Sequence, residues 1–276
     1  PAVTAAAVAS VQAISGGRAV LGLGRGDSAL AYLGHAPVGL AAFERAIGTV
    51  QALLSGDAVD FTALRGDGRE DAPSSDSLSL GARPGAARLK WLPEGLPKVP
   101  LDIAATGPRV IAMAAPLCER VTFSLGAIPE RIAWGLAIAR AARRAAGLPD
   151  AGVSYGAQIV VVCHPDAETA LALATSFVQP LARFQVIQGS GAGPFAPGDV
   201  EAFRGPPGKK AITRHADTTG GNRLTGQTVL SPDFVRRFAV VGTPEECAAR
   251  LHGLLDMGLD RLVLVGPGFY PEAWGD

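Results

Sequence analysis

Short apolar runs and helical segments alternate along most of this sequence, and that alternation constrains the fold more than any other feature. Strand-like runs rich in small and branched apolar residues occur at Ala19–Leu23, Leu101–Ala105, Val121–Leu125, Ser154–Cys163 and Leu262–Val265, with a weaker run at Phe238–Val241. Their lengths suit buried strands, and helical patterns lie between most neighbours. Such alternation indicates an α/β fold, in which crossover helices connect the strands of a parallel sheet.

Capping residues mark where several of the helices begin. Pro129 suits the first turn of a helix, where its missing N–H would have no partner in any case. Asp166 and Thr243 can each accept a hydrogen bond from the first turn of the helix that follows. The expected helices cover residues 38–55, 108–118, 129–146, 166–187 and 243–257.

The first residues of the chain predict a further helix, which ends at Gly16. Val3, Ala7, Val11 and Ile14 recur at helical spacing and therefore share one face. We expect this face to pack against the rest of the fold.

Two long segments interrupt the alternation, at residues 57–98 and 189–231. Both are rich in glycine, proline and polar residues and show no sustained periodicity. They are too long for ordinary connections between strands and helices, so we expect surface excursions or covers of an active site. The whole chain, residues 1–276, is expected to form a single domain with these two excursions.

Charge and cysteine content exclude several classes of function. The 25 basic and 25 acidic residues balance, so no overall field would attract nucleic acid or an anionic membrane. No apolar run approaches the roughly 20 residues that a membrane span needs. Cys118, Cys163 and Cys247 match no metal-ligand spacing and no disulfide framework. We therefore expect a cytoplasmic protein with no metal site and with neither nucleic acid nor membrane as a partner.

Three glycines, Gly22, Gly24 and Gly26, alternate at the carboxyl end of the first strand-like run. Glycines there let the backbone approach a ligand closely and leave N–H groups for an anion, and Arg25 can add a charge-assisted contact to a phosphate. A G-x-G-x-x-G dinucleotide turn is excluded, because Asp27 holds the third glycine position and an amphipathic helix replaces the acidic second strand. By pattern alone, a structural turn and an anion site both fit.

The run AATGPR, at the end of the second strand-like run, predicts an anion site at a helix N-terminus. Thr106 or Gly107 is placed to cap a helix whose first residue is Pro108. The Thr106 hydroxyl and the N–H groups of Gly107 and Arg109 then remain for an anion. Plain capping is the alternative role for Thr106, and a solvated side chain is the alternative for Arg109.

Three segments closely resemble the luciferase-like family of flavin-dependent oxidoreductases, the luciferase-like monooxygenases. They are SGGRAVLGLGRGDSALAYLG, PLDIAATGPRVIAMAAPLCERVTFSL and VVGTPEECAARLHGLLDMGLDRLVLVG. The motif GRGDSA, together with the motif ATGPR, is most similar to the branch of coenzyme F420-dependent methylenetetrahydromethanopterin reductases. The resemblance implies a (β/α)8 TIM barrel, coenzyme F420 or FMN as the cofactor and a small organic substrate, and it is compatible with a homodimer.

The resemblance also implies which residues hold the cofactor: Gly24, Arg25, Gly26, Ala105, Thr106, Gly107 and Arg109. In the bacterial luciferase branch, an arginine that matches Arg25 contacts the flavin phosphate. The two segments follow consecutive strands, so we expect them to hold one phosphate from two sides at the carboxyl end of the barrel.

Family members normally begin with about three strands ahead of the segment that Pro1 matches, so an N-terminally incomplete barrel is expected. Catalytic residues are left unassigned, because the cofactor carries most of the chemistry and no histidine stands out as a general base. The leading hypothesis is an oxidoreductase that passes hydride between reduced F420 or FMN and an organic substrate. The alternatives are a non-catalytic flavin- or phosphate-ligand-binding partial barrel and a sugar-phosphate barrel enzyme.

Overall fold

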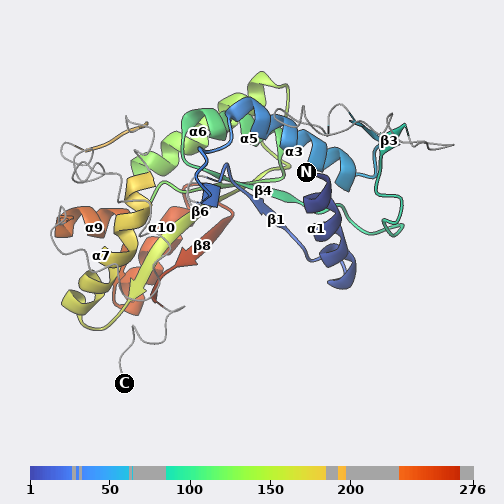
Figure 1. Cartoon of the computed structure of the whole chain (residues 1–276). Helices are drawn as coiled ribbons and strands as arrows, with labels where there is room; N and C mark the ends of the chain where they lie inside the picture. Colours follow the sequence, from blue (N-terminus) through green and yellow to red (C-terminus); the bar gives the residue numbers. More distant parts are fainter. Residues whose placement is uncertain are drawn as a thin grey trace. The chain divides into compact units, whose positions relative to one another are not determined.

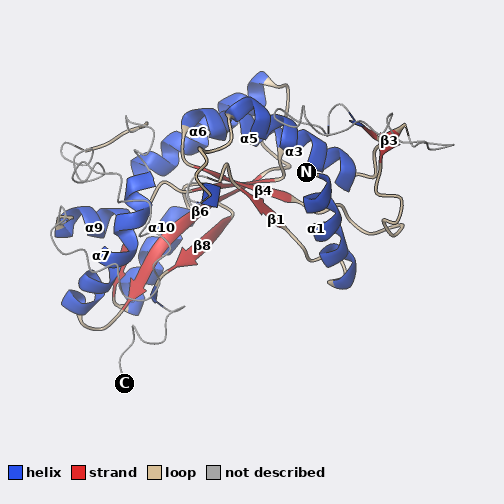
Figure 2. Cartoon of the chain, in the orientation of Figure 1, coloured by secondary structure: helices blue, strands red, loops and turns tan. Residues whose placement is uncertain are grey.

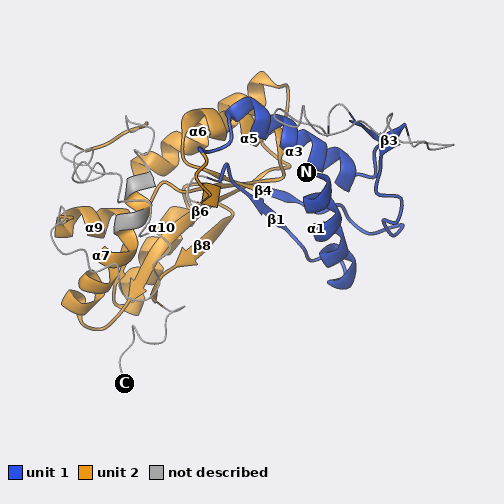
Figure 3. Cartoon of the chain, in the orientation of Figure 1, with its two compact units in different colours: residues 1–27, 36–102 blue, residues 28–35, 103–276 orange. Residues whose placement is uncertain are grey.

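The computed structural model describes residues 1–26, 29–30, 33–61, 64, 85–184, 192–196 and 230–267. The chain divides into two compact units. Unit 1 comprises Pro1–Asp27 and Ala36–Asp102, and unit 2 comprises Ser28–His35 and Ile103–Asp276 (Figure 3). Most of both predicted excursions lies outside the described residues, and the single domain stays a prediction.

The described part of unit 1 includes helices α1 and α3 and the strands that follow them (Figure 1). Its elements are α1 (Ala2–Ile14), β1 (Leu21–Leu23), α3 (Leu40–Leu54), β2 (Val59–Asp60), β3 (Ala86–Ala87) and the start of β4 (Leu101–Ala105). Helices α1 and α3 pack on each other, and β2 pairs antiparallel with β3. The Leu21 N–H donates to the Pro100 carbonyl at 3.0 Å, which places β1 beside the start of β4. The predicted strand at 19–23 and helix at 38–55 are confirmed within about two residues.

The buried face of α1 is not the one that the apolar spacing indicates, so that prediction is wrong. The large apolar residues of the predicted face are exposed: Val3, Val11 and Ile14. The buried residues are instead Ala5, Ala9 and Gln12. Gln12 donates through Nε2 to the Pro97 carbonyl and accepts the Ala19 N–H at Oε1, both at 2.7 Å. A polar side chain with both ends satisfied can be buried, which apolar periodicity does not anticipate.

Unit 2 alternates strands and helices around a parallel sheet (Figure 2). Its elements after β4 are α5 (Pro108–Leu117), β5 (Arg120–Phe123), α6 (Pro129–Ala145), β6 (Ser154–Cys163), α7 (Ala167–Phe184), α9 (Pro232–Phe238), β7 (Val240–Gly242), α10 (Pro244–Leu255) and β8 (Arg261–Val265). The order is β4-β5-β6-β7, with β8 also paired to β6. Strand β6 pairs parallel with β5, β7 and β8, which confirms the predicted α/β arrangement.

Helices bury the sheet of unit 2 through an apolar core. Helices α5 and α6 pack on each other, while α7 packs on α9 and on strands β6 and β7. The cluster beneath α7 includes Val160, Val178 and Phe238. Two predicted caps are confirmed: Asp166 Oδ1 accepts the Thr169 N–H at 2.7 Å, and Thr243 forms a capping box at the start of α10.

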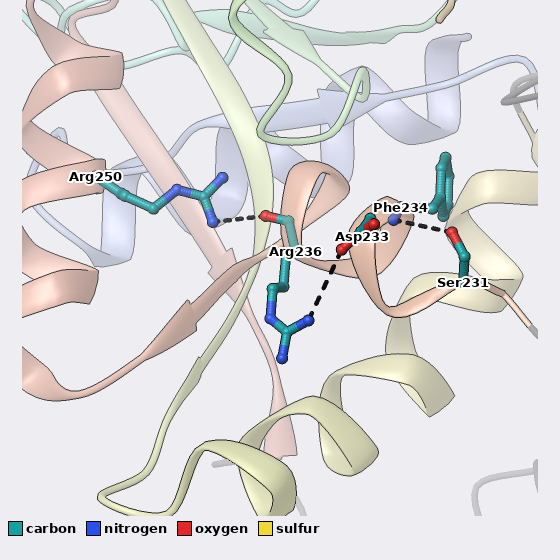
Figure 4. A network of polar contacts seen from close by, with 5 residues as sticks. All are labelled: Ser231, Asp233, Phe234, Arg236 and Arg250. Carbon is teal, nitrogen blue, oxygen red and sulfur yellow. Dashed lines mark hydrogen bonds and ion pairs between the residues drawn. The ribbon is translucent and has the colours of Figure 1, made fainter. Parts of the chain in front are cut away.

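Helix α9 is absent from the sequence prediction, which assigns Phe238 to a strand instead. The Ser231 hydroxyl accepts the Phe234 N–H at 3.2 Å and caps the helix (Figure 4). At its other end, Arg250 of α10 donates to the Arg236 and Ala239 carbonyls, both at 2.7 Å. A Ser-Pro-Asp start was the available signal, since each residue is favoured at the beginning of a helix.

Candidate functional site

The segment AATGPR forms the junction between β4 and α5 in unit 2. Ala105 ends the strand, and Pro108 takes the first position of the helix. Of the two candidate caps, the structure selects Gly107 as the N-cap, and no side chain hydrogen-bonds to the first turn. The Thr106 hydroxyl is therefore not used for capping.

The N-terminus of α5 presents donors that the described part of the chain does not occupy. No described residue accepts from the N–H groups of Gly107, Arg109 or Val110, or pairs with the Thr106 hydroxyl or the Arg109 guanidinium. A Cβ added at Gly107 would meet no atom within 4 Å, so the space beside the cap is open. A half-buried helix start with a hydroxyl, N–H groups without described partners and the exposed cation of Arg109 has the chemistry of an anion site.

The glycine turn after β1 belongs to unit 1. Gly26 has a φ of +79°, a left-handed conformation that favours glycine. Arg25 Nε donates to the Val38 carbonyl at 2.7 Å, and the Val38 N–H donates back to the Arg25 carbonyl at 3.0 Å. Arg25 thus closes this loop through Nε, while its Nη groups have no partner among the described residues. Gly24 is exposed beside it. The structure keeps each predicted segment together in its own unit.

A polar face on β5 and β6, which the sequence analysis did not identify, lies next to the β4–α5 junction. It consists of Thr122, Ser124, Ser154, Gly156 and Gln158. The Ser124 N–H donates to the Ala105 carbonyl at 3.0 Å, and the Ser124 hydroxyl donates to Gln158 Oε1 at 3.0 Å. The polar residues alternate with buried apolar ones in the two strands, and this was the signal that could have revealed the face.

Arg261 of β8 donates hydrogen bonds to Ser154 and Thr122, the residues of the polar face nearest the start of β5 and β6. Its Nη1 donates to the carbonyl and the hydroxyl of Ser154 at 2.9 and 3.0 Å, and its Nη2 donates to the Thr122 hydroxyl at 2.8 Å. The side chain crosses Gly156, where an added Cβ would lie 2.7 Å from Arg261 Cγ. Glycine at 156 therefore makes room for a side chain that links three parallel strands.

The histidines that lie within the described residues show no catalytic arrangement. His164 Nδ1 accepts the Asp166 N–H at 3.0 Å and so belongs to the turn before α7. His35 and His252 are exposed. His215 lies outside the described residues.

The cysteine thiols are free, and Cys118 and Cys247 are buried. Burial, with a smaller contribution from Cys163, raises the pKa of Cys247 to about 11, which holds it as a thiol rather than a nucleophilic thiolate. Among the described residues, His, Cys, Asp and Glu form no group that could hold a metal ion. Nor does any helix there have the length and apolar character to cross a membrane.

Comparison with known proteins extends these observations. The family model described as luciferase-like monooxygenase matches residues 1–261. The 5,10-methylenetetrahydromethanopterin reductase of Methanolobus tindarius is 24% identical over 273 residues, which cover 96% of this chain and 73% of that protein. The reductase of the same name from Archaeoglobus fulgidus is 26% identical over 277 residues, with 97% and 73% covered.

A solved structure with the same fold is the coenzyme F420-dependent tetrahydromethanopterin reductase from Methanopyrus kandleri. It superimposes with a TM-score of 0.61 at 18% identity, covering 99% of this chain and 76% of that one. Together with the family match, this likeness confirms the expected luciferase-like α/β barrel fold class. The incomplete N-terminal part of the barrel stays a prediction.

Proposed function

This chain belongs to the luciferase-like monooxygenase family, and from that premise we propose that it is an oxidoreductase that uses coenzyme F420 or FMN. The relatives are reductases, and a protein of the same fold is named as F420-dependent, which favours the deazaflavin. The substrate is a small organic molecule. A homodimer and a cytoplasmic location stay predictions from the sequence.

The start of α5 is the observation that carries this proposal. Both cofactors have a phosphate, and the open space at Gly107 lies beside the Thr106 hydroxyl and N–H groups that no described residue occupies. We propose that Ala105, Thr106, Gly107 and Arg109 hold this phosphate. Gly24, Arg25 and Gly26 are proposed to contribute as well, through the Arg25 Nη groups.

The protein's part in the reaction is to hold and orient. When bound, the cofactor supplies hydride transfer to or from an organic substrate. The partial positive charge of the helix N-terminus stabilises the phosphate, and the carboxyl-end position of the site is where barrel enzymes place their chemistry. The guanidinium of Arg261 and the hydrogen bonds of Ser124 keep β4, β5, β6 and β8 in a fixed relation beneath the site.

Titration of the full chain with F420 and with FMN, followed by cofactor fluorescence, tests the proposal. We expect saturable binding of F420 and loss of most of this affinity in Gly107→Val, whose side chain fills the space beside the cap. Gly39→Val is the matched control, because Gly39 caps α3 and also has open space around it. Binding of FMN without F420 would overturn the preference for the deazaflavin, and binding of neither would overturn the proposed function.

A further inference from the structure

The side-chain amide of Gln158, on the sheet of unit 2, has a donor without a partner among the described residues. Gln158 lies within β6 and is half-buried. Its Oε1 accepts the Ser124 hydroxyl at 3.0 Å. Among the residues that the structure describes, nothing accepts a hydrogen bond from its Nε2. The amide is thus fixed at one end and open at the other.

Backbone pairing places Gln158 level with the end of β4. The parallel register pairs Phe123 of β5 with Ala157 of β6, so the residues that follow them, Ser124 and Gln158, are neighbours as well. Ser124 in turn donates its N–H to Ala105. The three residues therefore lie side by side across three strands, and at the usual strand spacing Gln158 is about 10 Å across the sheet from Ala105.

The polar face around Gln158 is not covered in the way that the opposite face is. On the opposite face, the rings of Phe123 and Tyr155 stack at 6.0 Å, and Ala157 is fully buried. On the polar face, Arg261 occupies the level of Gly156, one layer below Gln158. The Nε2 end of the Gln158 carboxamide therefore lies one residue pair beyond the Arg261 side chain on this face, at the level of the β4–α5 junction.

The chemistry of this amide selects one part of the cofactor. With Ser124 donating to Oε1, both hydrogens of Nε2 remain without an acceptor among the described residues, so Gln158 is best matched to a ligand that accepts. The pyrimidine edge of a flavin or deazaflavin ring offers carbonyl and ring-nitrogen acceptors, whereas the hydroxyls of the sugar-alcohol chain also donate. That chain separates phosphate from ring, so a group about 10 Å from the phosphate loop is spaced for the ring rather than for the phosphate.

We propose that the Gln158 carboxamide donates a hydrogen bond to the pyrimidine edge of the bound ring, with Ser124 fixing its orientation. This inference rests on the proposed function and extends it from the phosphate to the ring. FMN and F420 share the pyrimidine edge, so the contact serves either cofactor. Reduction increases negative charge at this edge, and a fixed donor stabilises developing charge more than it stabilises the neutral form.

Dissociation constants of the full chain for the oxidised and the reduced cofactor test this contact. Gln158→Leu is expected to weaken binding of the oxidised form by about twofold to tenfold, the range of one neutral hydrogen bond. Binding of the reduced form should weaken about tenfold more. For a two-electron couple, that extra factor equals a midpoint potential of the bound cofactor about 30 mV more negative.

Two further variants keep the test decisive. Gln158→Glu has nearly the same shape but carries a negative charge, so it should weaken the reduced form even more than Gln158→Leu does. It also carries the test if the leucine variant does not fold, as judged by circular dichroism. Thr175→Val removes a hydroxyl from α7, away from the polar face, and should leave both dissociation constants and the potential unchanged.

The outcomes separate this inference from the proposed function. If the wild-type chain binds a cofactor while both Gln158 variants keep its affinities and potential, the ring contact is wrong and the proposed function stands. Equal weakening of the oxidised and reduced forms would indicate a structural role for Gln158 and would also overturn the contact. If the wild-type chain binds neither F420 nor FMN, the proposed function fails and this inference fails with it.

Discussion

The guanidinium of Arg131 lies 4.2 Å from the centre of the Phe195 ring, which joins helix α6 to a short described segment of the second excursion. Arg131 is buried, and its Nη1 donates to the carbonyls of Ala192 and Pro194 at 3.2 and 3.4 Å. Its Nε donates to the Leu125 carbonyl at 3.3 Å, next to Ser124 of the polar face. One side chain thus holds the end of β5 and part of the excursion together.

Replacing this arginine is expected to destabilise the protein. Arg131→Met removes charge-assisted hydrogen bonds and leaves carbonyls unsatisfied, so the free energy of unfolding should fall by at least about 3 kcal/mol, the upper value for one such bond. Urea denaturation measures the change. Arg144→Met is the control, since Arg144 is exposed on the same helix and should cost less than about 1 kcal/mol. Equal losses in the two variants would contradict a specific role for the buried contacts.

Gly126 is expected to tolerate no side chain, because two effects add there. Its φ is +76°, and an added Cβ would lie 2.7 Å from the Phe238 ring. Gly126→Ala should lower the free energy of unfolding by about 2–4 kcal/mol, from left-handed strain and overpacking together. Gly95→Ala has nearly the same φ, +75°, but open space, so it should show only the backbone cost of about 1–2 kcal/mol. Thermal denaturation of both variants isolates the contact with Phe238.

Arg25→Ala is expected to weaken cofactor binding by about 1.5–3 kcal/mol if its Nη groups hold the phosphate. Fluorescence titration with F420 and FMN provides the measurement. The substitution also removes the hydrogen bond from Nε to Val38, so the control must lose a similar backbone contact. Arg18→Ala does so, because Arg18 Nε donates to the Ser15 carbonyl at 2.8 Å. Unchanged affinity in Arg25→Ala would refute the role in binding.

The raised pKa of Cys247 predicts a loss of stability at alkaline pH. Burial and then Cys163 raise this pKa from 9.0 to about 11. Between these values the unfolded chain releases the thiol proton and the folded chain keeps it, so stability is full below pH 9 and falls as the pH rises towards 11. Urea denaturation from pH 8 to 11 should show a shallower decline in Cys247→Ala. Parallel declines in the two proteins would show that the thiol does not contribute.

The capping box of α10 predicts a modest local effect. Thr243 Oγ1 accepts the Glu246 N–H at 3.4 Å, and Glu246 Oε2 accepts the Thr243 N–H at 2.9 Å. Thr243→Ala should lower the free energy of unfolding by about 1 kcal/mol, whereas Thr243→Ser should retain most of it because the hydroxyl remains. Chemical denaturation distinguishes the two. A serine variant as unstable as the alanine variant would assign the effect to the lost methyl group.

Elements with their own start signals were predictable from the sequence. Pro129, Asp166 and Thr243 begin α6, α7 and α10 where expected, because a cap satisfies donors within its own first turn. The same signal at Ser231 begins α9. That helix was not predicted because the apolar run that follows it, Phe238–Val241, has the composition of a strand. The buried face of α1 could not be predicted from the spacing of its apolar residues, since burial of Gln12 depends on hydrogen bonds to Pro97 and Ala19.

The candidate site divides in the same way. By itself, the sequence predicted the two segments as anion sites, because a glycine turn and a helix start use donors that are adjacent in the chain, from Ala105 to Arg109 in one case. Only the tertiary structure decided that Gly107 rather than Thr106 caps α5, and that Ser124, which pairs with Ala105, meets Gln158. Those two residues are 34 positions apart, and the register of parallel strands, which no local pattern encodes, brings them together.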